Sequence, residues 1–176
     1  MDEIRLERCT LRGWRTTDEP SLVRHANNRK VWLNMRDLFP HPYTLEDARW
    51  WIETGSGADG LVSWAIVVDG EAIGGISLMP KKDVEHRTAG VGYWLGEAYW
   101  GRGIATEALR AVTDWAFVNL DLVRLEAGVF EWNPASARVL EKAGYTLEVR
   151  QPKAVTKDGR TIDRLFYARL RPSSPS

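Results

Sequence analysis

Cysteine is nearly absent from this sequence, and so are the long apolar runs of membrane-spanning helices. Cys9 is the one cysteine among 176 residues, so no disulfide can form within the chain, which fits a reducing compartment. We interpret Cys9 as a small apolar residue of a first strand. No stretch approaches the roughly 20 apolar residues of a membrane span, and the first residues lack the apolar run of a secretory signal. We therefore expect a cytoplasmic protein with no membrane partner.

An excess of either charge is absent as well. The chain has 24 Lys and Arg against 24 Asp and Glu, so its composition gives no electrostatic reason to expect nucleic acid as a partner. Any anion site must therefore be local. The length is that of a single domain, which we assign to residues 1–170, and the polar residues 171–176 are predicted to form a disordered tail.

Apolar periodicity and turn residues predict strands and helices in mixed order. Strands are predicted at 4–14, 61–68, 72–78, 89–95 and 124–130, with a last antiparallel pair at 145–150 and 161–170. Helices are predicted to begin at Thr16 or Thr17, at Lys30, at Thr44 with Asp47 as its capping partner, at Ile104, and at Asn133. We expect Gly144 to end the last of these helices.

The stretch 99–108, YWGRGIATEA, joins a backbone-specific turn to the start of the longest predicted helix. Gly101 and Gly103 flank Arg102, and glycines at a helix start let several free N–H groups point at one spot. These groups, the helix dipole and Arg102 together would hold a phosphate or pyrophosphate. Taken alone, the pattern is more often a tight turn in which glycine is chosen only for its geometry.

Two other phosphate-binding patterns do not fit this stretch. The Walker A pattern requires a Gly-Lys-Ser/Thr sequence, which does not follow Gly103. The dinucleotide-binding fingerprint requires a third glycine, and Thr106 stands in that position. A nucleotide-binding protein is therefore disfavoured, and we expect no metal site because Mg²⁺-holding residues are missing from the helix start.

Two motifs together resemble the GNAT N-acetyltransferases. The segment 100–105, WGRGIA, is similar to the acyl-CoA pyrophosphate loop of that family, although Trp100 stands where the family has Gln or Arg. The segment 133–145, NPASARVLEKAGY, matches the family's Asn-x-x-Ser/Ala helix that ends in Gly-Phe/Tyr. The form W-G-x-G-x-A-T-E-A looks like the Rim-type branch, which acetylates N-terminal alanines of ribosomal proteins. The resemblance runs from Leu6 to Leu170.

The resemblance implies an α/β (α+β) fold and acetyl-CoA as the cofactor. The fold has a mixed, mostly antiparallel central sheet of six to seven strands with a V-shaped splay, flanked by about four helices. The strands at 89–95 and 124–130 begin side by side and then part, and the pantetheine arm fills the gap between them. The expected cofactor-binding residues are Trp94 and Leu95 on the strand, Gly101, Arg102, Gly103, Ile104, Ala105 and Thr106 in the loop, and Asn133 and Ser136 on the next helix.

The implied reaction is direct attack of a neutral amine on the thioester. An amine with a pKa near ~10 needs a base at neutral pH, and Glu97 and Glu131 are the candidates. The oxyanion needs a donor, for which the N–H of Leu95 is a candidate. Ser136 is expected to serve the leaving thiolate, because Leu140 occupies the position where many family members have a tyrosine. Ser136 fits equally a hydroxyl bonded to its own helix backbone.

The expected acceptor is a protein N-terminal amine, with a small amine such as a polyamine, an amino acid or an aminoglycoside-like molecule as the alternative. A non-catalytic acyl-CoA-binding sensor is the alternative of another class, because it would keep the loop and lack the base. A homodimer is a further partner that the sequence leaves open. Fold alone does not decide the substrate.

Overall fold

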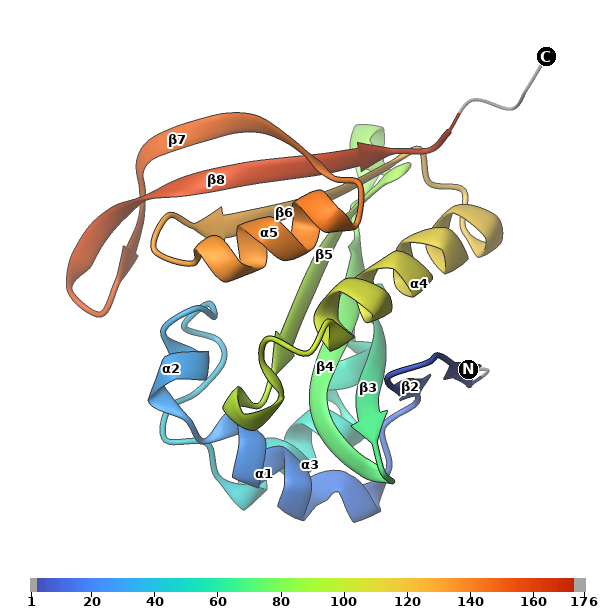
Figure 1. Cartoon of the computed structure of the whole chain (residues 1–176), viewed down its shortest axis with the longest axis vertical. Helices are drawn as coiled ribbons and strands as arrows, with labels where there is room; N and C mark the ends of the chain where they lie inside the picture. Colours follow the sequence, from blue (N-terminus) through green and yellow to red (C-terminus); the bar gives the residue numbers. More distant parts are fainter. Residues whose placement is uncertain (1–2, 173–176) are drawn as a thin grey trace.

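One eight-stranded sheet organises the computed structural model, which describes residues 3–172. Its strand order is β1-β2-β3-β4-β5-β6-β8-β7, and all neighbours are antiparallel except β5 and β6, which are parallel (Figure 1). The strands are β1 (Ile4–Arg5), β2 (Thr10–Arg12), β3 (Val62–Val68), β4 (Glu71–Pro80), β5 (Thr88–Leu95), β6 (Arg124–Phe130), β7 (Thr146–Lys157) and β8 (Arg160–Leu170). The expected mixed, mostly antiparallel sheet is confirmed, with eight strands in place of six or seven.

Five α-helices and several short 3-10 turns accompany the sheet in the described residues. They are α1 (Glu19–Ala26), α2 (Arg29–Trp32), α3 (Leu45–Glu53), α4 (Ile104–Asn119) and α5 (Pro134–Lys142). The α3 cap is the predicted one, since Thr44 and Asp47 bond each other's main-chain N–H groups. No helix within residues 3–172 combines the length and apolar character needed to cross a membrane.

The N-terminal segment differs from its prediction as one strand. Residues 4–12 form a short hairpin, in which the N–H of Leu6 donates to the carbonyl of Cys9 at 2.9 Å. The turn is held by Glu107 of α4, whose carboxylate accepts from the N–H groups of Glu7 at 3.2 Å and Arg8 at 2.9 Å. The turn that separates β1 from β2 thus depends on Glu107, a residue about a hundred positions further along the chain.

The helices pack on both faces of the sheet. Helix α4 contributes Ile104, Leu109 and Val112 to the main core, which also takes in Trp64 and Tyr167. Helices α1 and α3 form a second cluster with Leu22, Ala26 and Ala48 on the opposite face. Successive side chains of a strand point to opposite faces, so Tyr93 packs with the first cluster and Trp94 with the second.

Strands β5 and β6 part after a short paired stretch, as predicted. Their parallel ladder covers only Thr88–Gly90 of β5 against Arg124–Glu126 of β6. Beyond it, β5 continues along β4 to Leu95, while β6 continues along β8 to Phe130. The gap between the two strands lies under α5 in Figure 1.

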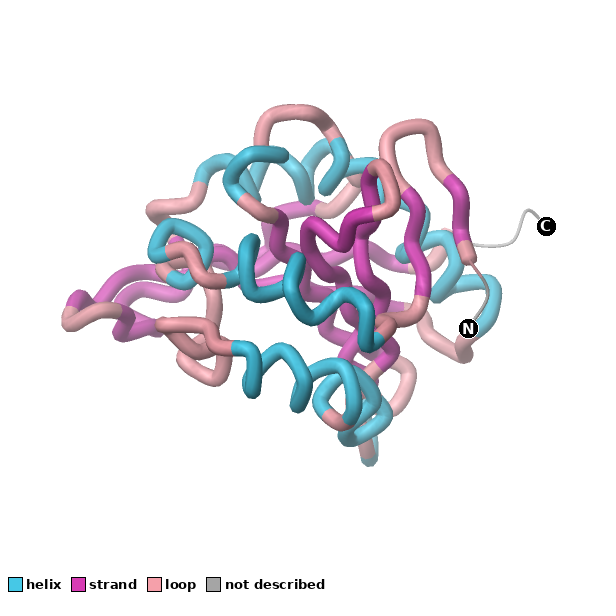
Figure 2. The backbone as a smooth tube through the Cα atoms, turned by 90° about the horizontal axis from the view of Figure 1, so that it is seen from below, coloured by secondary structure: helices cyan, strands magenta, loops and turns pink. Residues whose placement is uncertain are grey.

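The C-terminal hairpin is longer than predicted and reaches back to α2. Strand β7 extends to Lys157, and the hairpin projects away from the body of the molecule (Figure 2). Lys157 is 2 % exposed, and its Nζ lies 2.6 Å from Asp37 Oδ1 and 3.6 Å from the Trp32 ring centroid. After β8, Arg171 donates to the carbonyls of Phe117 and Leu120 at 2.6 and 2.7 Å. Arg171 is thus tied to the end of α4, and residues 173–176 of the predicted tail lie outside the described residues.

Candidate functional site

The glycine loop before α4 has the backbone geometry that an anion site needs. Gly101 and Gly103 have φ of +74° and +78°, in the left-handed region that favours glycine. Gly103 is the N-cap residue and brings no side-chain cap. The first main-chain bond of the helix runs from the N–H of Glu107 to the carbonyl of Gly103 at 3.1 Å. Within the described residues, the N–H groups of 104–106 have no acceptor in the protein, so they are available to a ligand.

Two arginines lie at this loop, and only one was expected. The guanidinium of Arg102 is placed over the ring of Tyr99, 5.1 Å from its centroid. Arg8 comes from the turn between β1 and β2, and its Nε would be 3.5 Å from a Cβ built on Gly103. Glu107 sets this position by binding the N–H of Arg8. Sequence reasoning missed Arg8 because nothing in its local pattern indicates a neighbour so far along the chain.

The main-chain polar groups of β5 alternate between its two edges. The carbonyl of Thr88 and the N–H of Gly96 both bond toward the β4 side, at 2.9 and 2.8 Å. In an uninterrupted antiparallel ladder, Trp94 therefore also bonds toward β4, whereas Tyr93 and Leu95 face the gap beside β6. The main-chain groups of Trp94, one of the expected cofactor-binding residues, are thus used within the sheet.

The gap-facing carbonyl of Leu95 already has a partner. Trp100 donates its indole N–H to this carbonyl at 2.8 Å. The bond closes the loop between β5 and the glycine turn and gives a structural use to the residue that departs from the family pattern. The main-chain N–H of Leu95 takes no part in this bond and is also directed at the gap.

The start of α5 places Asn133 and Ser136 together. Asn133 Oδ1 accepts from the N–H of Ser136 at 3.2 Å, which confirms Asn133 as the helix N-cap. The Ser136 hydroxyl lies 2.9 Å from the hydroxyl of Tyr93 on β5, a residue that sequence reasoning did not select. Burial raises the pKa of Tyr93, so this phenol stays protonated. Leu140, at the position of the usual family tyrosine, is fully buried.

Both expected general bases are engaged by other groups. Glu97 pairs with Lys30 and accepts from Asn28 Nδ2 at 2.9 Å, and these two hydrogen bonds lower its pKa. Glu131 accepts from Arg150 Nη2 at 2.6 Å and from the N–H of Asp163 at 3.0 Å. Within residues 3–172, no three His, Cys, Asp or Glu side chains gather into a group suited to a metal ion.

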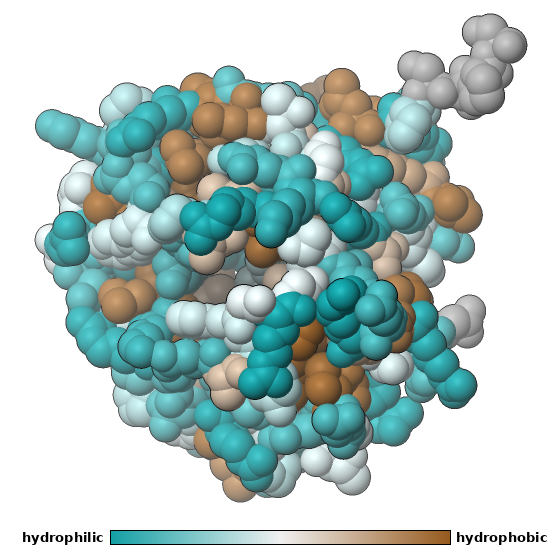
Figure 3. Space-filling view, viewed as in Figure 1, coloured by the Kyte–Doolittle hydropathy of each residue, from teal (hydrophilic) through white to brown (hydrophobic). Residues whose placement is uncertain are grey.

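The molecular surface is hollowed beside these residues. In the space-filling view, a hollow opens between α5 and α2, where the ribbon shows β5 behind the gap (Figures 1 and 3). The same face carries hydrophilic side chains around the opening (Figure 3). The glycine loop, the free edge of β5 and the start of α5 therefore border one region of the molecule.

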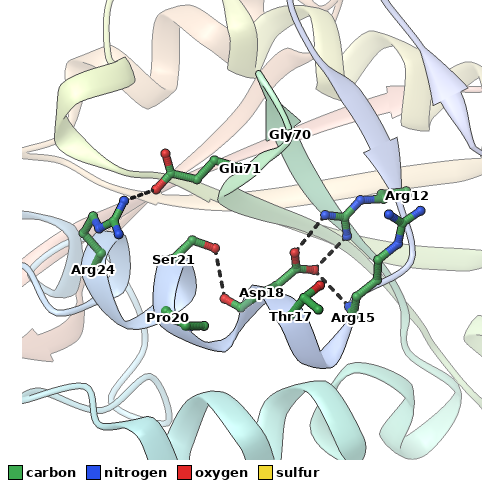
Figure 4. A pocket seen from close by; sticks show the side chains of 9 residues that line it. All are labelled: Arg12, Arg15, Thr17, Asp18, Pro20, Ser21, Arg24, Gly70 and Glu71. Atoms are coloured by element: carbon green, nitrogen blue, oxygen red, sulfur yellow. Dashed lines mark hydrogen bonds and ion pairs between the residues drawn. The ribbon is translucent and has the colours of Figure 1, made fainter.

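A pocket of about 350 Å³ lies away from these residues, on the α1 side (Figure 4). Arg12 forms two hydrogen bonds with the Asp18 carboxylate, at 2.7 and 2.8 Å, and Arg24 lies 2.6 Å from Glu71. These pairs neutralise Arg12 and Arg24, whereas Arg15, the third arginine of the lining, forms no ion pair within residues 3–172. The lining residues are Arg12, Arg15, Thr17, Asp18, Pro20, Ser21, Arg24, Gly70 and Glu71.

Comparison with curated proteins finds several acetyltransferases. The chain is 44 % identical over 104 residues to "Probable N-acetyltransferase YjcK" of Bacillus subtilis (strain 168), an alignment that covers 59 % of this chain and 58 % of YjcK. The chain thus spans less than two thirds of that relative. It is 28 % identical over 179 residues to "Uncharacterized N-acetyltransferase p20" of Bacillus licheniformis, with 97 % of both chains covered.

Solved structures share the fold. RimL, described as a ribosomal alpha-N-protein acetyltransferase in complex with coenzyme A, superposes with a TM-score of 0.84 at 23 % identity, covering 96 % of this chain and 98 % of RimL. The sequence pattern of the family described as "Acetyltransferase (GNAT) domain" matches residues 8–146. Because that match takes in most of the chain, including the glycine loop and the start of α5, the protein belongs to the GNAT family of N-acetyltransferases.

Proposed function

We propose that this protein transfers an acetyl group from acetyl-CoA to a primary amine, and that the preferred acceptor is the N-terminal amine of a protein. The proposal rests on two features of the structure taken together. One is the set of free N–H groups at the start of α4. The other is the β5 edge left unpaired where β6 departs. A ligand with a diphosphate and an amide-bearing arm satisfies both.

The residues present fit such a ligand. The left-handed glycines 101 and 103 keep side chains away from the N–H groups of 104–106, and a Cβ at Gly101 would meet nothing within 4 Å. We assign the diphosphate to this loop beside Arg102, while the nearby Arg8 already pairs with Glu7 at 3.3 Å and with Glu107 at 3.6 Å. The arm is assigned to the gap-facing main-chain groups of Tyr93 and to the side-chain amide of Asn133.

The chemistry follows from where donors lie along the gap. Acetyl-CoA supplies an acetyl thioester, which a neutral amine attacks at the carbonyl carbon. The N–H of Leu95 is the donor we assign to the oxygen that gains charge. The Ser136 hydroxyl is the donor we assign to the departing sulfur. The proton lost by the amine balances the proton gained by the thiol.

The choice of acceptor rests on the Rim-type pattern and on relatives. Residues 100–108 carry the W-G-x-G-x-A-T-E-A form, and Ser136 stands where that branch uses a serine. RimL, which shares the fold, is named for acetylating the alpha-amine of a protein. A panel of N-terminal peptides, polyamines and amino acids, followed by release of free thiol, separates the acceptor classes. Binding of acetyl-CoA with no thiol release from any amine would identify a sensor.

The loop assignment predicts the effect of Thr106→Glu. Residue 106 lies in the first turn of α4, where a carboxylate is favourable for the helix but repels a bound diphosphate. With at least ~1 kcal/mol for each close pair of like charges, we expect acetyl-CoA affinity to fall about tenfold or more. Isothermal titration calorimetry measures the affinity, and added salt should reduce the loss.

The matched control is Val118→Glu. Val118 lies near the other end of the same helix, is 83 % exposed, and receives the same change in charge. We expect its acetyl-CoA affinity to equal that of the unmodified protein. Equal affinities for Thr106→Glu and Val118→Glu would show that the diphosphate binds elsewhere.

A further inference from the structure

The hydroxyl pair formed by Tyr93 and Ser136 joins two elements across the molecule. Tyr93 lies on β5 and Ser136 in the first turn of α5, and their hydroxyl oxygens are 2.9 Å apart. The Tyr93 hydroxyl also donates to the main-chain carbonyl of Ser136 at 3.2 Å. Tyr93 packs against the main core, so its ring is fixed and its hydroxyl is held at the helix start.

Two proton arrangements share these heavy-atom positions. A tyrosine has one hydroxyl proton, which can be donated either to the Ser136 carbonyl or to Ser136 Oγ. In the first arrangement, the Ser136 hydroxyl donates a hydrogen bond to the Tyr93 oxygen. In the second, Ser136 Oγ accepts a hydrogen bond from Tyr93, and the Ser136 hydroxyl donates to another acceptor. No side chain has to move between them.

Without such a partner, the direction in which a serine hydroxyl donates its hydrogen bond is less well defined. In a helix, a serine hydroxyl commonly turns back to bond a main-chain carbonyl of its own helix. A donor at Oγ favours the arrangement in which the serine proton points away. It also makes that proton a stronger donor, since linked hydrogen bonds polarise one another.

We propose that Tyr93 is a positioning residue for acetyl transfer, which donates to Ser136 Oγ and thereby directs the Ser136 proton to the leaving sulfur. The inference rests on the function proposed above. In the reaction the nitrogen–carbon bond forms and the carbon–sulfur bond breaks. The proton that the sulfur gains from Ser136 is replaced by the one that the amine loses. Tyr93 keeps its own proton throughout, consistent with the raised pKa of this buried phenol.

The test is a double-mutant cycle with Tyr93→Phe and Ser136→Ala. One hydrogen bond is worth about 0.5–1.5 kcal/mol, so Tyr93→Phe should lower kcat by roughly threefold to tenfold. The KM for acetyl-CoA and its affinity by calorimetry should not change. Because Tyr93 acts through Ser136, adding Tyr93→Phe to Ser136→Ala should lower kcat no further.

A second measurement does not depend on turnover. The thiol of bound CoA is titrated by the ultraviolet absorbance of its thiolate. A directed Ser136 proton stabilises that thiolate, so Tyr93→Phe should raise the pKa of the bound thiol by about half a unit to one unit. Ser136→Ala should raise it at least as far, and the double variant should match Ser136→Ala.

Tyr145→Phe is the matched control. Tyr145 is another buried phenol, whose hydroxyl lies 2.8 Å from Thr113 Oγ1 in the core. It should lose stability as Tyr93→Phe does, yet keep kcat and the thiol pKa. Equal effects of Tyr93→Phe and Tyr145→Phe, or additive effects of Tyr93→Phe and Ser136→Ala, would overturn the inference. Failure of the unmodified protein to bind acetyl-CoA, measured first, would instead overturn the proposed function.

Discussion

At the scale of single residues, the carboxylates near the gap are held by cations. Glu97 is bonded by Lys30 and Asn28, which lowers its pKa and weakens it as a base. Glu131 bonds Arg150 and the main chain of β8. A carboxylate that must first leave an ion pair is a poor proton acceptor. We therefore expect the deprotonation of the acceptor amine itself to govern the pH dependence.

The variants Glu97→Gln and Glu131→Gln test this expectation. Each removes one carboxylate charge with little change in shape, and we expect kcat/KM to fall less than about threefold in either. Removing a true general base costs about 10²-fold to 10⁴-fold. The measurement is the pH profile of kcat/KM with one peptide acceptor. A loss of that size in one variant, with a flattened acid limb, would identify its glutamate as the base and restore the prediction made from sequence.

Residues whose partners are close in sequence were the predictable ones. Asn133 caps the helix that contains Ser136, and Thr44 pairs with Asp47, both within three positions. Tyr93 was missed because its partner Ser136 is 43 positions away. A strand tyrosine has the same local pattern whether it meets a hydroxyl or only apolar core. Topology brings the two together, and no local signal carries that information.

At the scale of elements, the β7–β8 hairpin is anchored at its tip. Lys157 buries its charge between the Trp32 ring and Asp37, and Asp158 lies 2.7 Å from Arg29. Lysine is almost never this buried unless it is paired. The sequence predicted nearly all of β8 but only the first residues of β7, because the outer part of β7 shows no apolar alternation to mark it as a strand. Contacts with α2 supply the order instead.

Lys157→Ala should loosen the hairpin tip. It removes a desolvated cation–π contact, worth about 2 kcal/mol, together with the ion pair to Asp37. We expect amide hydrogen exchange at residues 157–161 to accelerate about tenfold or more, with the β3–β4 amides unchanged. Lys153→Ala makes the same charge change at an exposed position of β7 and should leave the tip protected. Equal amide exchange rates at residues 157–161 in both variants would contradict the proposed role of Lys157 as an anchor.

At the scale of the whole molecule, one sheet carries the core and the site together. The main core includes side chains of β2 to β6, of β8 and of both α4 and α5, so the two walls of the gap are continuous with it. The sequence predicted this class of fold because its strands are apolar and its two motifs are local. The short N-terminal hairpin escaped prediction, since its turn depends on Glu107.

That core also buries groups that ionise at alkaline pH. Burial, with a smaller contribution from Glu107, raises the pKa of Cys9 from 9.0 to about 12. Burial likewise raises the pKa of Tyr145 from 10.0 to about 12. Between the unfolded and folded values, the folded protein holds protons that the unfolded chain has lost. The contribution of these two groups to the free energy of unfolding is therefore fully present below pH 9. It is lost as the pH rises toward 12.

The contribution of Cys9 can be isolated with Cys9→Ala. Each retained proton makes the free energy of unfolding fall by about 1.4 kcal/mol per pH unit, so the unmodified protein should lose stability more steeply than Cys9→Ala from pH 9 upward. Urea unfolding at several pH values measures both slopes. The absolute stability of Cys9→Ala also drops through lost packing, but this drop is independent of pH and leaves the slopes comparable.

Tyr145→Phe should alter the slope only above pH 10, where its phenol ionises in the unfolded chain. Parallel curves for the unmodified protein and Cys9→Ala would mean that the thiol ionises in the folded state, and the Cys9 side chain would then have to be open to solvent.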